Sequence, residues 1–226
     1  MTRPFDAIFA DAAARKGGPA ALDALLAETP SRPPSEIAAT PDDRVLAEMA
    51  RRIFNAGFSS KVIAAKWPAF ESAFEGFDPH ACAFMPDEKL EALLADPGIV
   101  RNGAKIKAVQ ANARMVVDLA AEHGSAASFI ARWPDADYVG LLELLKTRGS
   151  HLGGDSGMRV LRALGKPAFI TTKDVVAALI REGVVAKTPS SKRDFAAVQD
   201  AFNAWSVQSG RDFTAISRTL ALTVGP

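Results

Sequence analysis

Apolar and polar residues follow the 3.6-residue period of an α-helix along most of the chain. After Pro41, apolar residues recur three or four positions apart in successive segments, and glycine, proline or capping residues separate these segments. The period of two that indicates β-strands is almost absent. We therefore predict an all-α fold. The expected helices cover about residues 41–57, 59–74, 86–94, 102–122, 126–133, 136–148, 158–164, 172–182, 191–209 and 213–224.

The first forty residues have a different composition from the remainder. They are rich in alanine, and prolines recur between Pro30 and Pro41. Proline lacks an N–H donor and disfavours helical geometry in the residue before it. The pattern predicts a short helix at about 20–28 and an extended or loose segment after it. We expect residues 1–40 to be an N-terminal extension and 41–226 to form one helical domain.

The start of that domain carries strong helix signals. Thr40 offers a capping hydroxyl, Pro41 suits the first helical turn, and Asp42 and Asp43 place acids at the positive end of the helix dipole. We therefore expect Thr40 to cap the helix that begins here.

Composition and charge narrow the class of protein. Hydrophobic residues make up 48% of the chain and charged residues 23%, and the sequence contains no apolar run long enough to cross a bilayer. The N-terminus does not resemble a signal peptide, so we expect a cytoplasmic protein that does not associate with membranes. The single cysteine, Cys82, rules out an internal disulfide and an all-cysteine zinc site. A formal net charge of +1 argues against a non-specific nucleic-acid coating protein.

The segment Leu141–Gly165 holds the most informative motif. An apolar helix ends in a basic turn, a glycine-rich stretch follows at about 149–157, and a second apolar-periodic helix begins. This pattern is typical of a helix-hairpin-helix, whose exposed N–H groups bind the phosphates of DNA. Leu152 would anchor the hairpin in the core. The alternative is an ordinary glycine loop joining two helices of a bundle.

Three further motifs accompany the hairpin: Ala56–Ser59, Phe77–Pro79 and, most specifically, the block Ile99–Arg114 with the pattern IVRN-x-x-KI-x-A-x-x-x-NAR. Over about residues 43–185 the chain resembles the bacterial 3-methyladenine DNA glycosylase I family, within the helix-hairpin-helix glycosylase superfamily. The resemblance implies a two-lobed helical fold. It also implies an enzyme that kinks DNA, flips an alkylated base and cleaves its N-glycosidic bond.

The chain departs from the family at several functional positions. Arg52 stands where the family has its pocket glutamate, and Ser60 stands where it has a stacking tryptophan. The family's zinc needs cysteine and histidine ligands, whereas this chain has one cysteine and three histidines, and the C-terminal ligand position reads Asp174. We therefore expect no zinc and no other cofactor.

Two carboxylates are candidates for catalysis. Asp174 follows the second hairpin helix, two residues from the position of the superfamily's catalytic aspartate. Its alternative role is that of an acid in the first turn of a helix. Glu48 lies one turn before Arg52, and its alternative role is an intrahelical ion pair with that arginine.

Candidate contacts to DNA come from two regions. Arg52, Phe54, Phe58 and Trp67 are the candidate base pocket, although most phenylalanines of a helical protein belong to its core. A solvated basic surface is the alternative for the charged positions that follow. The hairpin candidates are Arg148, Gly149, His151, Gly153, Gly154, Ser156 and Arg159, and other basic candidates are Arg101, Lys105, Lys107 and Arg162.

These observations predict a monomeric DNA repair protein that binds double-stranded DNA and excises an alkylated purine such as 3-methyladenine. Hydrolysis would be monofunctional, because no lysine follows Gly157 where lyase-type relatives carry their nucleophile. The substitutions at Arg52 and Ser60 motivate an alternative, a non-catalytic module that recognises damaged or distorted DNA. A helical protein whose hairpin contacts another protein is the third possibility.

Overall fold

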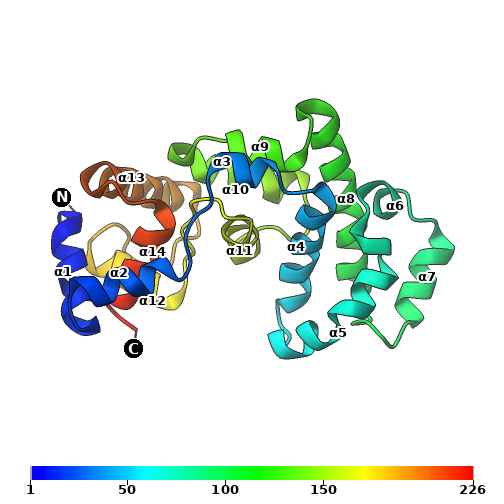
Figure 1. The fold of residues 1–226 in the computed structure, drawn as a ribbon, viewed down its shortest axis with the longest axis horizontal. Helices are drawn as coiled ribbons and strands as arrows, with labels where there is room; N and C mark the ends of the chain where they lie inside the picture. Colours follow the sequence, from blue (N-terminus) through cyan, green and yellow to red (C-terminus); the bar gives the residue numbers. More distant parts are fainter. Residues whose placement is uncertain (1, 226) are drawn as a thin grey trace. The chain divides into compact units, whose positions relative to one another are not determined.

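The structure is a computed structural model that describes residues 2–225 (Figure 1). This part of the chain holds fourteen α-helices and two 3-10 helices and no strand, so the all-α prediction is confirmed. The α-helices are α1 Phe5–Lys16, α2 Pro19–Ala27, α3 Pro34–Ala38, α4 Asp42–Asn55, α5 Ser60–Ala73, α6 Pro79–Ala83, α7 Asp87–Ala95, α8 Gly103–His123, α9 Ala126–Arg132, α10 Tyr138–Arg148, α11 Asp155–Ala163, α12 Lys173–Arg181, α13 Lys192–Ser209 and α14 Phe213–Leu222. The 3-10 helices are Glu75–Phe77 and Asp135–Asp137.

The chain divides into two compact units. The central unit comprises Pro33–Trp133 and Leu141–Leu164, and the terminal unit comprises the chain up to Arg32, Pro134–Gly140 and the chain from Gly165 onward. The N-terminal segment therefore packs with the C-terminal helices. The division into an extension over 1–40 and a domain over 41–226 stays a prediction.

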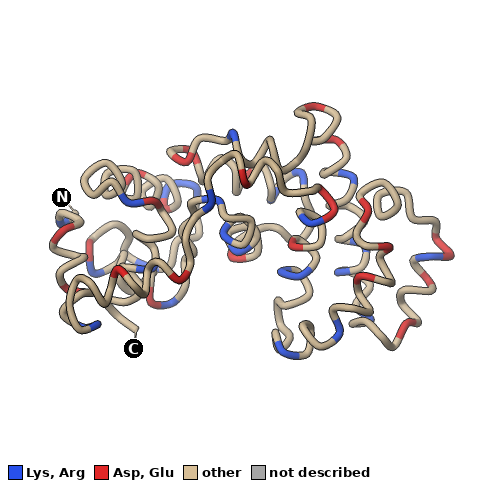
Figure 2. Tube along the Cα trace, in the orientation of Figure 1, with Lys and Arg blue, Asp and Glu red and all other residues tan. Residues whose placement is uncertain are grey.

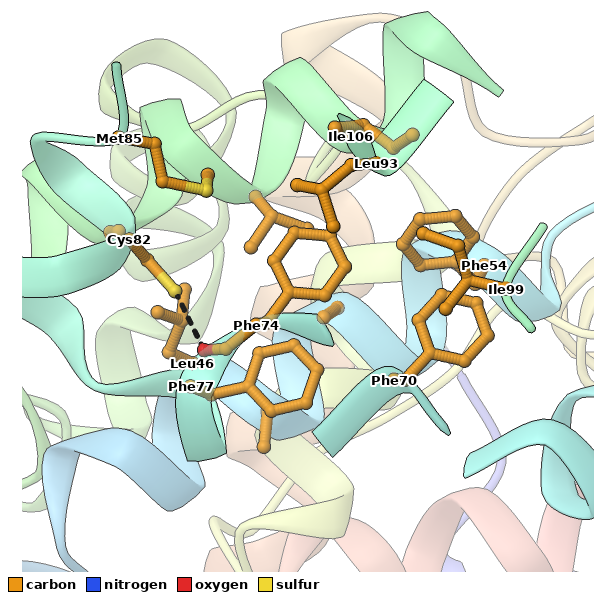
Figure 3. Close-up of a cluster of buried hydrophobic side chains, with 14 of the residues drawn as sticks. Leu46, Phe54, Phe70, Phe74, Phe77, Cys82, Met85, Leu93, Ile99 and Ile106 are labelled. Carbon is orange, nitrogen blue, oxygen red and sulfur yellow. Dashed lines mark hydrogen bonds between the residues drawn. The ribbon is translucent and has the colours of Figure 1, made fainter. Parts of the chain in front are cut away.

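The core of the central unit is built around α8. This helix runs between α4 and α6 and also packs against α7 and α9 (Figure 1). A group of fully buried phenylalanines, Phe54, Phe70, Phe74 and Phe77, fills the space beside it (Figure 3). Neighbouring rings lie 4.5–6.3 Å apart, within the range of favourable aromatic contacts.

The terminal unit packs α1 and α2 against α14, with α12 and α13 beside it. Its largest fully buried side chain is Trp205, whose Nε1 donates to the main-chain oxygen of Arg3 at 3.1 Å. The Arg3 guanidinium in turn binds the buried carboxylate of Glu182 through two hydrogen bonds of 2.8 and 2.9 Å. The first residues of the chain are thus held by partners about 180 to 200 positions away.

Most predicted helices are confirmed, and the differences have local causes. The helix at about 20–28 is α2, but α1, α3 and α6 were not predicted. The expected cap at Thr40 is wrong: Pro41 occupies the N-cap of α4, and the Thr40 hydroxyl donates to the oxygen of Glu36. The carboxylate of Asp42 instead accepts from the N–H groups of Ala126 and Ala127 and so caps α9.

None of the helices within residues 2–225 is long and apolar enough to span a bilayer. Acidic and basic residues are interspersed along both units (Figure 2). The net charge therefore does not determine whether one face of either unit is basic.

Replacing Arg3 with alanine is expected to destabilise the terminal unit. The Arg3 hydrogen bonds lower the pKa of Glu182, so its ionised form stabilises the fold above the unfolded pKa, and this stabilisation is lost as the pH falls through the folded pKa. We expect Arg3→Ala to reduce the free energy of unfolding by about 1–2 kcal/mol at pH 7. The difference from the unsubstituted protein should shrink below about pH 4. Urea unfolding at several pH values measures both effects.

The matched control is Arg193→Ala, which removes an exposed arginine of the same unit. Equal losses of stability in the two variants at neutral pH would contradict the assigned role of Arg3.

Candidate functional site

The predicted hairpin connects α10, which ends at Arg148, to α11, which begins at Asp155. Leu152 is 1% exposed, as expected for the residue that anchors the turn. His151, Gly153 and Gly154 are exposed, so the tip of the turn faces solvent. The helix after the turn begins three residues earlier than predicted, because Gly154 adopts φ +57° and ψ −138° and directs the chain into α11 at once.

Two other glycines let the hairpin approach its surroundings closely. A Cβ atom on Gly149 would lie 2.6 Å from the main-chain oxygen of Leu145 and 3.0 Å from Oδ1 of Asn112. A Cβ atom on Gly157 would lie 2.5 Å from the main-chain oxygen of Leu152. No side chain fits at either position, so both glycines are needed for packing. A DNA contact by the main chain of Gly149 stays a prediction.

The two arginines among the hairpin candidates already form ion pairs with acids. Arg148 donates to both carboxylate oxygens of Glu122, at 3.0 and 3.2 Å, and this contact lowers the pKa of Glu122. Arg159 pairs with Asp155 at 3.3 Å across one turn of α11. Exposed ion pairs of this kind contribute about 0–1 kcal/mol, so a phosphate group can replace the carboxylate at small cost.

The candidate pocket residue Arg52 and the candidate catalytic residue Glu48 form the predicted intrahelical ion pair on α4. Arg52 Nε donates to Glu48 Oε1 at 2.5 Å. The two side chains are 31% and 18% exposed, so both are partly accessible from solvent. A guanidinium at this position offers hydrogen-bond donors and positive charge, where a carboxylate would attract a cationic base.

Asp174 lies in the other unit, in the first turn of α12. Thr172 caps this helix by accepting from the N–H of Val175 at 3.3 Å, so Asp174 has the position expected of a first-turn acid. Gly225 lies against it: a Cβ atom on that glycine would be 2.9 Å from Asp174 Oδ2. The catalytic role of Asp174 stays a prediction.

Two of the three aromatic candidates lie in the core or pack against it. Phe54 is fully buried. Trp67 stacks on Phe77 with ring centroids 5.3 Å apart, donates from Nε1 to Glu71 at 2.8 Å, and has the Arg51 guanidinium 4.2 Å from its ring centroid. These contacts already occupy the ring, which favours the structural role for Trp67.

Phe58 is the candidate aromatic that is accessible. It is 44% exposed in the loop after α4, and the Lys105 ammonium lies 4.7 Å from its ring centroid. Lys105, which we predicted on a basic surface, is only 8% exposed and donates to the main-chain oxygens of Phe54 and Ala56. That prediction for Lys105 is wrong, because its charge is used inside the fold, where burial lowers its pKa.

The residues present do not fit the zinc ion that the family resemblance implies. Cys82 is buried and donates to the main-chain oxygen of Phe74 at 3.4 Å, and burial raises the pKa of its thiol to about 12 (Figure 3). Within residues 2–225, no three histidine, cysteine, aspartate or glutamate side chains gather as metal ligands.

Sequence reasoning missed Asn112. This residue is fully buried in α8 and makes two hydrogen bonds to the main chain of Ser150 in the hairpin. A signal was present, because Asn112 falls at helical spacing between Val109 and Val116 on an apolar face. A polar residue at such a position must find a partner.

Comparison with known proteins shows what the central segment is similar to. Residues 38–140 match the model of the methyladenine glycosylase family, which confirms the resemblance over that range. A stretch of 64 residues is 36% identical to DNA-3-methyladenine glycosylase 1 of Escherichia coli K12, covering 28% of this chain. The aligned stretch spans 34% of that relative, about a third of its length.

Solved structures show the same fold. The 3-methyladenine DNA glycosylase I of Staphylococcus aureus matches with a TM-score of 0.52 and 22% identity, over 61% of this chain and 80% of that one. A variant of 3-methyladenine DNA glycosylase I in complex with 3-methyladenine matches with a TM-score of 0.50 and 23% identity, over 55% of this chain and 77% of that one. The fold is thus that of the helical glycosylases.

The two glycines at the hairpin tip are expected to respond differently to alanine. Gly154 has a positive φ that side chains rarely adopt, so Gly154→Ala should lower the free energy of unfolding by about 1–3 kcal/mol. The nearest atom to a Cβ on Gly153 would be Lys146 Cγ at 3.4 Å, an ordinary contact, so Gly153→Ala should change stability by less than about 0.5 kcal/mol. Chemical denaturation of both variants measures this difference, and equal effects would contradict the hairpin geometry.

Proposed function

We infer that the chain is a DNA repair protein that binds duplex DNA and excises an alkylated purine such as 3-methyladenine. We also propose that it is monomeric and cytoplasmic. The inference starts from the match of residues 38–140 to the methyladenine glycosylase family. The observation that carries the proposal is that one compact unit combines residues 38–133 of the matched segment with a hairpin whose tip glycines are exposed. Main-chain N–H groups at such a tip can approach a phosphate closely.

The proposed reaction is hydrolysis of the N-glycosidic bond. Methylation at N3 gives adenine a positive charge and makes it a good leaving group, so the enzyme mainly has to flip the base and stabilise the cationic sugar as water attacks the anomeric carbon. Unstacking costs a few kcal/mol and less for a damaged pair. Phe58 supports this proposal as an exposed aromatic in the loop that follows α4, the helix that carries the partly accessible Glu48 and Arg52.

A specific observation favours a second function, recognition of damaged DNA without base excision. By the family resemblance, Arg52 stands at the position of the pocket glutamate, and in the structure its Nε is bound to Glu48. A guanidinium there repels a cationic base, and the pairing withdraws the Glu48 carboxylate from the role of stabilising positive charge. The hairpin could bind DNA unchanged in such a protein.

Release of free base from methylated duplex DNA tests the proposed function. We expect 3-methyladenine among the bases released, as measured by chromatography. Glu48→Gln should lower the rate about 100-fold if Glu48 stabilises the transition state, and Asp174→Asn should do so if Asp174 has that role. Glu91→Gln, an exposed change on α7, is the control and should leave the rate unchanged. No released base of any kind from folded protein would overturn the proposal.

The double variant Arg52→Glu with Ser60→Trp separates the two functions. If the protein only recognises damage, the unsubstituted chain releases no base and the double variant gains activity. If it is a glycosylase, the unsubstituted chain already turns over. The single variant Ser60→Trp controls for the added aromatic surface, since it leaves the charge at position 52 unchanged.

A further inference from the structure

A fully buried side chain of α8 holds the main chain of the hairpin. Asn112 Oδ1 accepts from the Ser150 N–H at 2.7 Å, and Asn112 Nδ2 donates to the Ser150 main-chain oxygen at 3.0 Å. The two residues are 38 positions apart in the sequence. Both polar groups of one peptide residue are therefore satisfied by a single amide, which fixes the position and orientation of Ser150 together.

The next residue has a strained backbone. His151 has φ +58°, in the left-handed region that costs a residue with a Cβ atom about 1–2 kcal/mol. Such a conformation persists only when its neighbours impose it. Here Ser150 is held by Asn112 on one side, and Leu152 is buried to 1% exposure on the other. His151 is thus exposed between two fixed residues, and the exposed Gly153 and Gly154 follow directly.

The packing around this contact leaves little freedom. A Cβ atom on Gly149 would contact Oδ1 of Asn112 at 3.0 Å and Cδ1 of Leu152 at 2.8 Å. The hairpin main chain therefore lies directly against α8 with no side chain between them. Because of this direct contact, the position of Asn112 determines the position of the turn.

We propose that Asn112 is a positioning residue for DNA binding: it holds the 149–154 hairpin in the one conformation in which its exposed main-chain groups meet a phosphate. This inference rests on the proposed function, in which the hairpin is the DNA contact. Asn112 is buried and does not touch DNA. It acts by removing the conformational entropy that a loose hairpin would lose on binding.

Duplex binding of Asn112→Leu tests the proposal. This change preserves much of the volume but leaves both polar groups of Ser150 without their partner. We expect the Kd for a duplex to rise about tenfold by fluorescence anisotropy. The slope of log K against log salt should stay unchanged, because the neutral main-chain N–H groups of the hairpin displace no counterions from the phosphates. A purely stabilising role would reduce the fraction of folded protein but would leave the Kd of the folded fraction unchanged.

The matched control is Gln110→Leu on the same helix. Gln110 Nε2 donates to the main-chain oxygen of Met85 at 2.9 Å, so this variant removes a comparable hydrogen bond away from the hairpin. Its Kd and salt slope should equal those of the unsubstituted protein. Equal losses of DNA affinity in the two variants, or unchanged binding by folded Asn112→Leu, would overturn the role of Asn112. Neither result would contradict the proposed function. Absence of salt-dependent duplex binding by the unsubstituted protein would overturn the proposed function and this inference with it.

Hydrogen exchange of the unsubstituted protein provides a test that does not depend on a variant folding. The Ser150 amide should exchange slowly although its loop is partly exposed, and DNA should slow exchange at Gly153 and Gly154. Exchange of the Ser150 amide at the rate of a free amide would overturn the proposal.

Discussion

Main-chain carbonyl groups at helix ends and in loops need donors, and in the central unit the side chains of α8 supply them. Four polar residues of this helix each reach a carbonyl of a neighbouring segment, so one helix connects α4, the α6–α7 region and the hairpin. This explains why the Ile99–Arg114 block is such a specific pattern: its polar residues make the tertiary hydrogen bonds and its apolar residues make the core. The contacts are Lys105 to Phe54 and Ala56, Gln110 to Met85, Asn112 to Ser150, and Arg114 to Ala83.

The helices that could be predicted are those whose signals are local. The long α8 has a regular apolar period and a true cap, since Asn102 Oδ1 accepts from the Lys105 N–H, and α13 begins with a complete capping box at Ser191. The five-residue helices α3 and α6 are too short to show a period and owe their geometry to packing and to proline. Thr40 shows the limit of a local signal, because Pro41 takes the cap position and the nearby Asp42 serves a helix more than eighty residues away.

The residues of the candidate site likewise fall into those with a local sequence signal and those whose role depends on distant contacts. The Glu48–Arg52 pair and the buried Leu152 follow from helical spacing and from the hairpin pattern, so the sequence indicated both. The roles of Asn112 and Lys105 depend on partners 38 and about 50 positions away, which no local pattern specifies. Trp67 illustrates the converse: its residue type suits a base pocket, but its partners within the fold already contact the ring.

The charges of the chain limit how the proposed DNA affinity can arise. Lysine and arginine outnumber the acids by one, and both candidate arginines beside the hairpin are paired with carboxylates. Exchanging a carboxylate for a phosphate at an exposed arginine yields little net free energy, because one weak ion pair replaces another. The favourable term in the proposed binding must then come from groups that give up only water, with no carboxylate to displace, and exposed main-chain N–H groups on a turn already fixed in place meet that condition. For the proposed binding by a protein this close to neutral, the rigidity of the hairpin therefore matters more than the number of its basic residues.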